Sequence, residues 1–236
     1  MILDISGLEI VYPDKTKAVD KFNLQMKNSE SLALAGANGA GKTTLLLAIA
    51  GIVPVSKGCI QVDGIKLTKK TINDIRARVG LIFQNPDDQL FMTNVYNDIA
   101  FGPRNYGASE DEVKQRVEQA LSELGITRLC NRSVLKLSAG EKRLAAIATV
   151  LSMRPAILLF DEPTAFLDLK ARRNMIRLLN NMPYAKLIVS HDLHFLEETC
   201  ERVVLMKDGS VFSGGITKEI FRNETLMEDC GLEGIT

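Results

Sequence analysis

The sequence predicts an α/β domain built around a buried parallel sheet. Apolar segments at 157–160 and 187–189 are expected to be strands, and a helical pattern at about 169–181 between them makes a βαβ unit. A third short strand, 31–35, leads into a glycine-rich loop and then into a helix at 44–50. Together these observations favour a parallel sheet with helices packed on it.

Antiparallel strands and a helical insertion are also expected. Asp-Gly pairs at 63–64 and 208–209, each following an apolar run, are hairpin signals. The S-x-x-E spacing at 109–112 is a capping box that predicts a helix over 109–125. A second helix is expected over 138–154, where a proline stops it. With no internal repeat or low-complexity linker, the chain is expected to form one domain with an inserted helical lobe.

Composition disfavours several classes of protein. Lysine plus arginine and aspartate plus glutamate are both 29, so no strong net field favours nucleic acid or acidic lipid. The four cysteines, at 59, 130, 200 and 230, form no C-x-x-C pair, which disfavours a zinc site or a disulfide framework and suits a reducing cytosol. No signal-peptide pattern and no run of about 18 apolar residues occurs. We therefore expect a partner to hold the chain at any membrane where it works.

The glycine-rich loop fits the phosphate-binding pattern G-x-x-x-x-G-K-[ST]. Its residues are Gly36, Ala37, Asn38, Gly39, Ala40, Gly41, Lys42 and Thr43. Successive backbone N–H groups and the following helix N-terminus bind anions. Lys42 is expected to reach the β- and γ-phosphates of a nucleotide, and the Thr43 hydroxyl to bind Mg²⁺. The alternative, a glycine-rich turn with a chance lysine, explains neither the strand before the loop nor the helix after it.

Two acids follow the expected strand at 157–160. A phosphate-binding loop needs an acidic partner for the metal at the end of a hydrophobic strand, and Asp161 occupies that place. Glu162 is placed to polarise a water in line with the γ-phosphate. The alternative is a strand that ends in two solvated acids. In a chain that already carries the loop, we favour the catalytic interpretation.

The pentad Leu-Ser-Ala-Gly-Glu at 137–141 resembles the L-S-G-G-Q signature of ATP-binding cassette (ABC) ATPases, and Lys-Arg follows it as in that family. Other motifs of the family match in order: Gln84 of the Q-loop, 163–168 of the D-loop and 190–192 around the switch histidine. The resemblance covers essentially the whole chain. It implies an ABC-type nucleotide-binding domain spanning 1–236, with a P-loop, RecA-like core, an antiparallel β subdomain and an inserted helical subdomain. The implied core covers about 1–86 and 155–236, and the helical subdomain about 87–154.

The same resemblance implies an ATPase that uses ATP and Mg²⁺. Glu162, His191 and Gln84 would be catalytic, and Thr43, Gln84 and Asp161 would hold the metal. The residues expected to contact nucleotide are Tyr12, Gly36, Ala37, Asn38, Gly39, Ala40, Gly41, Lys42, Thr43, Thr44, Ser138, Ala139, Gly140, Glu141 and Asp168. Tyr12 would stack on adenine, and the alternative is an ordinary strand aromatic. His191 and His194 lack a third ligand for a metal pair.

The signature also implies a partner. Ser138 and Glu141 have capping-box spacing, which starts a helix, and a capped helix N-terminus can itself bind an anion. In the family two copies pair head to tail, and each signature completes the other's site. This sequence departs from the family at Ala139, where the signature has glycine, and at Phe166, where the D-loop has a small residue. Neither change removes a charged catalytic group, so activity is expected.

The segment 83–91, Phe-Gln-Asn-Pro-Asp-Asp-Gln-Leu-Phe, narrows the resemblance. With 98–103 and 139–143 it looks like the ATPase of energy-coupling-factor importers, where this segment forms a short helix lining a groove for coupling helices of a transmembrane subunit. The alternative is an Asn-Pro turn with exposed Leu90 and Phe91. A short C-terminal tail and a complete catalytic set favour a homodimer at the cytoplasmic face of the membrane, with cobalt or nickel as cargo.

Three alternatives remain. A vitamin importer of the same type would carry the same motifs. A soluble ABC protein acting on DNA, RNA or ribosomes would be expected to show a long coiled-coil insertion or two fused cassettes. A P-loop nucleotide kinase would lack the signature and the switch histidine. We expect no nucleic-acid partner and no direct contact between this chain and the transported substrate.

Overall fold

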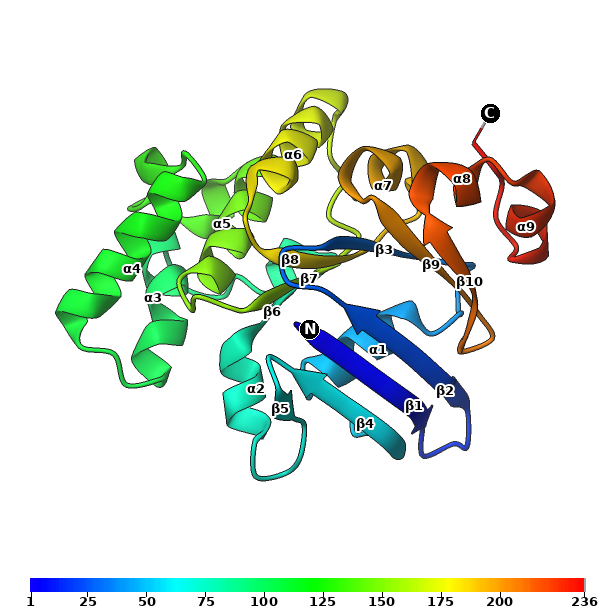
Figure 1. Cartoon of the computed structure of the whole chain (residues 1–236). Coiled ribbons are helices and arrows are strands. Elements are labelled where there is room, and N and C mark those ends of the chain that lie inside the picture. Colours follow the sequence, from blue (N-terminus) through cyan, green and yellow to red (C-terminus); the bar gives the residue numbers. More distant parts are fainter. Residues whose placement is uncertain (236) are drawn as a thin grey trace.

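The computed structural model describes residues 1–235, and it contains two sheets and a lateral group of helices (Figure 1). The first sheet is antiparallel and has the order β2-β1-β4-β5. Its strands are β1 (Leu3–Val11), β2 (Lys17–Met26), β4 (Lys57–Val62) and β5 (Ile65–Lys66). The second sheet has the order β10-β9-β3-β8-β7-β6. Its strands are β3 (Ser31–Ala35), β6 (Val79–Ile82), β7 (Ile157–Asp161), β8 (Ala185–Val189), β9 (Arg202–Lys207) and β10 (Ser210–Ile216).

Five neighbouring strands of the second sheet run parallel, and only β10 pairs antiparallel. β7 and β8 are adjacent, which confirms the βαβ unit predicted from the apolar segments. Both two-residue hairpins are also confirmed. Asp63-Gly64 and Asp208-Gly209 all have positive φ, as a type I′ turn requires.

Helices cover both faces and one end of the parallel sheet. The helices that follow the core strands are α1 (Lys42–Ile49), α2 (Ile72–Arg78), α6 (Leu169–Asn181), α7 (Leu193–Thr199), α8 (Thr217–Phe221) and α9 (Glu224–Asp229). The lateral lobe, green in Figure 1, contains α3 (Val95–Asn105), α4 (Glu110–Glu123) and α5 (Ala139–Leu151). Short 3₁₀ turns η1 (Pro86–Asp88), η2 (Thr127–Leu129) and η3 (Val134–Lys136) connect it.

The parallel sheet separates two hydrophobic cores. Alternate residues of β3 point to opposite faces, so Leu32 and Leu34 join one core while Ala33 and Ala35 join the other. The first core lies between the sheet, α1 and the antiparallel sheet. The second packs the other face against α5, α6 and α7. Burial on both faces explains why these strands are continuously apolar.

Two details of the predicted helices are wrong. The helix over 109–125 starts with the Ser109 Oγ accepting from the Glu112 N–H at 3.3 Å, but the return bond of the capping box does not form. The Glu112 carboxylate binds Arg116 instead, at 2.6 Å. The second helix ends at Leu151 rather than 154. The N–H groups of Met153 and Arg154 bond three residues back, to Val150 O and Leu151 O, and Arg154 then leaves helical geometry with φ +55°.

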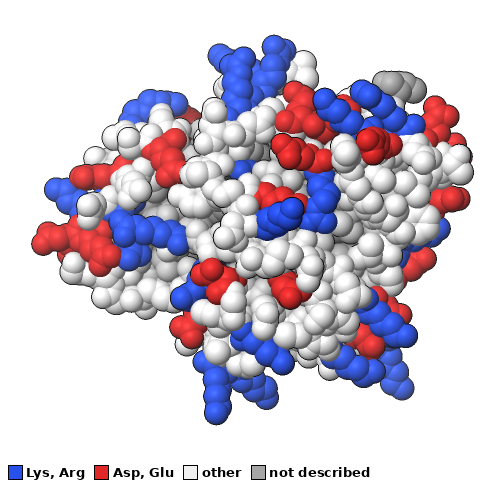
Figure 2. All heavy atoms as spheres, viewed as in Figure 1, with Lys and Arg blue, Asp and Glu red and all other residues white. Residues whose placement is uncertain are grey.

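Charge is mixed over the surface. Acidic and basic side chains lie interspersed on the face shown in Figure 2, in keeping with the equal numbers of the two signs. Among residues 1–235, no helix is both long and apolar enough to cross a membrane.

Candidate functional site

The phosphate-binding loop joins β3 to α1, as predicted, and its backbone is tightly enclosed. A Cβ at Gly41 would lie 2.2 Å from the carbonyl oxygen of Ala18, and one at Gly36 would lie 2.2 Å from that of Met206. Gly41 also has φ +100°, a conformation that favours glycine. The loop therefore has space for backbone but not for side chains at these two positions, and its N–H groups precede the N-terminus of α1.

The side chain of Lys42, the first residue of α1, bonds back to the loop that precedes it. Its Nζ donates to the carbonyl oxygens of Gly36 at 2.7 Å and Ala37 at 2.9 Å, and the residue is buried. Burial lowers the pKa of Lys42, and the nearby Glu162 and Asp161 carboxylates oppose that shift. A buried ammonium facing a glycine-rich loop is suited to bind a phosphate.

An oxygen pair beside the lysine fits a magnesium ion. The Thr43 hydroxyl donates to Asp161 Oδ2 at 3.0 Å, which joins the start of α1 to the end of β7. Asp161 is buried, and burial raises its pKa, while the hydrogen bond from Thr43 and the charge of Lys42 counteract this. Hydroxyl and carboxylate oxygens next to a phosphate site are the donors that Mg²⁺ prefers.

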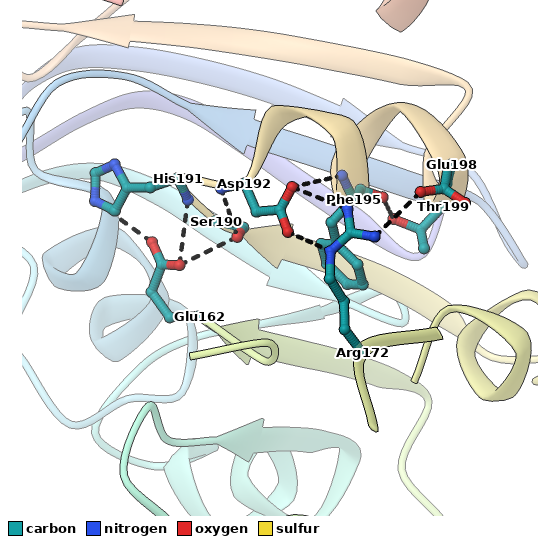
Figure 3. Close-up of polar contacts among 8 residues, drawn as sticks. All are labelled: Glu162, Arg172, Ser190, His191, Asp192, Phe195, Glu198 and Thr199. Atoms are coloured by element: carbon teal, nitrogen blue, oxygen red, sulfur yellow. Dashed lines mark hydrogen bonds and ion pairs between the residues drawn. The ribbon is translucent and has the colours of Figure 1, made fainter. Parts of the chain in front are cut away.

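Glu162 is held by the strand next to its own. Its N–H donates to Val189 O at 2.9 Å, and its Oε2 accepts from Ser190 Oγ at 3.1 Å and from His191 N at 3.2 Å (Figure 3). Its Oε1 is buried without a hydrogen bond, although His191 Nε2 lies 3.4 Å away. We regard this contact as charge proximity only, which attracts when the imidazole is protonated. Oε1 is thus an acceptor to which no donor is bonded.

A polar network extends from this carboxylate to two helices (Figure 3). Ser190 Oγ accepts from the Asp192 N–H at 3.1 Å, and the Asp192 carboxylate takes two bonds from Arg172, at 2.6 and 3.0 Å. Burial alone would raise the pKa of Asp192, but the hydrogen bonds from Arg172 and Phe195 lower it overall. Arg172 was missed by the sequence reasoning, because nothing in a helix arginine indicates a partner 20 residues away.

Tyr12 lies at the same site. Its hydroxyl is 3.0 Å from Thr44 Oγ1, which connects the end of the antiparallel sheet to α1. The Asp168 carboxylate instead caps α6, where it accepts from Ala171 N at 2.7 Å. The structure therefore brings together Tyr12, the loop, Asp161, Glu162 and His191.

The signature residues form a second group. Ser138 and Glu141 make the full capping box at the start of α5. Glu141 Oε1 also lies 2.9 Å from Arg128 Nη1 and 3.5 Å from Arg132 Nη1, two partners that the sequence reasoning missed. Within residues 1–235, no hydrogen bond or ion pair links Ser138, Ala139, Gly140 or Glu141 to the phosphate-binding loop. Phe166 of the D-loop has φ +64° and is 81% exposed.

Gln84 follows the end of β6, and its backbone is bound to the helical lobe. Its carbonyl accepts from Arg143 Nη2 at 2.5 Å. Farther along this segment, the alternative of a turn with an exposed Leu90–Phe91 pair holds for only one member. Leu90 is 5% exposed and joins the core, whereas Phe91 is 63% exposed and packs edge-on against Phe101.

Comparison with known proteins agrees with this geometry. A family model described as ABC transporter matches residues 19–165. GSU1281 of Geobacter sulfurreducens, whose name places it among ABC transporter ATP-binding proteins, is 44% identical over 98% of this chain and 93% of its own. The energy-coupling factor transporter ATP-binding protein EcfA of Methanothermobacter thermautotrophicus is 39% identical over 98% of this chain and 76% of its own.

A solved structure agrees equally well. cbiO1 from Clostridium perfringens, described as part of the ABC transporter complex cbiONQ, has a TM-score of 0.86 and 36% identity, covering 97% of this chain and 93% of its own. The family model spans more than half of the chain, and the relatives match along nearly all of it. This chain therefore belongs to the ABC transporter ATP-binding family, and it is an ABC ATPase, the ATP-binding subunit of a transporter.

Proposed function

We propose that this chain is the ATP-hydrolysing motor of an energy-coupling-factor importer whose cargo is cobalt or nickel. We infer the importer type from the exposed surface that follows the Q-loop in the chain. Phe91 and Phe101, 63% and 39% exposed, pack edge to face with ring centroids 4.9 Å apart. The two rings offer apolar surface to a protein partner. Similarity to EcfA and to cbiO1, part of a cbiONQ complex, supports a transmembrane partner, and we assign it to this surface.

The proposed roles of the residues follow from their positions. The loop amides and Lys42 bind the triphosphate of ATP, while Thr43, Asp161 and Gln84 hold Mg²⁺. When bound, the metal neutralises charge on the phosphates. Glu162 accepts a proton from the attacking water, and His191 contacts the γ-phosphate from the end of β8. Tyr12 stacks on the adenine beside Thr44.

A second copy is proposed to complete the site. The capped N-terminus of α5 is a suitable anion site, yet its residues make no bond to the loop of their own chain. In a head-to-tail homodimer, Ser138, Ala139, Gly140 and Glu141 of each copy would face the nucleotide of the other, together with Asp168. ATP would then close the two copies at the cytoplasmic face of the membrane, and hydrolysis would reopen them.

Purification and uptake together test the proposal. The tagged chain should co-purify from membranes of its own host, in mild detergent, with a multispanning membrane protein. Cells lacking the chain should lose high-affinity uptake of radioactive cobalt or nickel. The wild-type chain should restore it, and Glu162→Gln should not. Loss of vitamin uptake instead would favour the vitamin importer, and co-purifying nucleic acid would overturn transport altogether.

A further inference from the structure

Arg143 is the largest side chain that the fold buries completely, at 1% exposure, and the proposed chemistry does not use it. Its guanidinium donates from Nη1 to Phe83 O at 2.6 Å and from Nη2 to Gln84 O at 2.5 Å. Its Nε is buried without a partner. Burying a cation costs stability unless hydrogen bonds or an opposite charge compensate it.

The two carbonyls belong to the segment Phe83–Gln89, which we name the Q-segment. Other side chains also attach the Q-segment to α5. Gln89 donates to Ala146 O and to Thr149 Oγ1, both at 2.8 Å, while its Oε1 accepts from the Phe83 N–H at 3.3 Å. On the surface, Lys142 pairs with Asp87 at 2.6 Å. The Q-segment is therefore bonded at both ends to one helix.

We infer that Arg143 is a positioning residue that fixes Gln84 to the signature helix, so that Gln84 and Ser138 move as one unit. Arg143 lies about one and a half helical turns beyond Ser138 on α5. The two residues are thus joined by a single rigid element and one guanidinium. The inference rests on the proposed function for the roles of Gln84 at its own site and Ser138 at the partner's site.

Chemistry explains why arginine suits this position. Its planar guanidinium carries two parallel donors in a fixed fork, so it can bind two successive carbonyls at once. A lysine ammonium keeps the charge but not the fork. The two carbonyls come directly after β6, whose last residue Ile82 pairs with Phe160 just before Asp161. Arg143 therefore acts at the junction between the core strand and the lobe, the boundary proposed near residue 86.

Arg143 also borders a small cavity shared by three motifs. Its lining includes Asn85 and Pro86 of the Q-segment, Ala139 of the signature, and Phe166 of the D-loop. Burial lowers the pKa of Arg143, and the charge of Asp161 opposes this shift. The guanidinium therefore lies where the Q-segment, signature helix and D-loop meet, close enough to the proposed metal site for its charge to act there.

The test combines hydrogen exchange with steady-state kinetics on Arg143→Met, Arg143→Lys and a control in the same helical lobe, Arg116→Met. In Arg143→Met we expect amide exchange in residues 83–89 to become at least tenfold faster, while the interior of α5 keeps its rate. We expect kcat to fall at least tenfold and the KM for ATP to change less than threefold. Arg143→Lys should lie between this variant and the wild type. Arg116→Met should change either quantity less than twofold, because it removes only an ion pair within α4, to Glu112.

Three results would overturn the inference. Wild-type kcat with faster exchange in residues 83–89 would show that the bond does not serve hydrolysis. Uniformly faster exchange throughout α5, with kcat lost only in proportion to unfolded protein, would show a purely structural arginine. If Arg143→Met fails to fold, Arg143→Lys decides alone, and full kcat with unchanged exchange would refute the need for the fork. A different cargo or membrane partner would leave these readouts unchanged, so failure of the proposed function is distinguishable.

Discussion

The hydroxyl of Thr43 and the carboxylate of Asp161 meet at 3.0 Å although 118 positions separate them in the chain. This bond joins the first turn of the phosphate-loop helix to the end of a central strand. It places two hard oxygen donors on one side of Lys42, whose own bonds go to the loop carbonyls. The prediction of a magnesium site therefore rests on this pair of side chains.

Asp161→Asn should abolish the metal dependence while leaving the fold intact. The amide oxygen can still accept from Thr43, but the charge that binds Mg²⁺ is gone. We expect hydrolysis to fall by about 10²-fold or more, the scale for removing one charge-stabilising group, and metal-free ATP binding to persist. Turnover against Mg²⁺ concentration measures this. A wild-type metal dependence in the variant would place the ion elsewhere.

Glu162→Gln should bind ATP and hydrolyse very little of it. A positioned general base contributes roughly 10²–10⁴-fold, and the amide cannot accept the proton. Single-turnover kinetics with radiolabelled ATP would measure the loss. Ser190→Ala is the matched control, since it removes the 3.1 Å bond to Oε2 and the bond from the Asp192 N–H but keeps the carboxylate, and it should reduce turnover far less. Near wild-type turnover in Glu162→Gln would end the role given to this residue.

Lys42→Ala should lose nucleotide affinity without losing the fold. The substitution leaves the carbonyls of Gly36 and Ala37 without this donor, which should cost some stability but not the fold, while the triphosphate loses its charged partner. Equilibrium binding of a fluorescent ATP analogue measures the change, and Lys15→Ala, on an exposed turn, provides the control. If both variants bind ATP equally well, the phosphate assignment is wrong.

Ser138→Ala and Ser109→Ala form a matched pair. Each serine caps a helix of the same lobe by accepting an N–H at 3.3 Å, so each substitution should cost about 1 kcal/mol of stability. Only Ser138 is proposed to face a second nucleotide. We therefore expect ATPase activity to fall in Ser138→Ala and to persist in Ser109→Ala. Equal activities would show that Ser138 is a cap and nothing more.

Asp98→Asn should gain stability relative to the wild type as pH rises. Asp98 Oδ1 accepts from the N–H groups of Phe91 and Met92, both at 3.0 Å, but Oδ2 is buried without a partner. Burial raises the pKa of Asp98. A raised pKa means that stability present below the ordinary aspartate pKa is lost as pH rises through the folded-state value.

Asparagine does not titrate, so its advantage should grow across that window and then level off. Urea unfolding of both proteins between acidic and neutral pH measures the difference. Asp98→Ala is the control. It leaves the two N–H groups unpaired and should cost about 1–3 kcal/mol throughout. A difference that is flat with pH, or that favours the wild type at higher pH, would contradict the prediction.

Local patterns predicted most of the fold. Hairpins at 63–64 and 208–209 were predictable because Asp-Gly pairs tolerate positive φ. The parallel strands were predictable because burial on both faces requires continuous apolar runs. The missing half of the capping box at Ser109 was not predictable, since the choice of Glu112 between a backbone N–H and Arg116 depends on side-chain geometry.

For the site, the contacts between residues far apart in the chain could not be predicted from the sequence. The loop, Asp161, Glu162 and His191 were named from motifs, and the structure groups them, while their roles stay predictions. Arg143 and Arg172 were not identified as functional, because an arginine in a helix gives no sign of which carbonyl or carboxylate it will meet. The alternative of an exposed Leu90 was open in the sequence, and only the packing of the fold shows that this side chain joins the core.

The backbone of Glu162 has a further consequence. Its φ of +48° is a left-handed conformation that residues with a Cβ adopt at a cost, and the same is true of Phe166 four residues on. Glycine at 162 would remove this strain. It would also remove the carboxylate that accepts from Ser190 and His191, and with it the enzymatic activity. In this short turn, the chain keeps a strained backbone in order to retain a carboxylate.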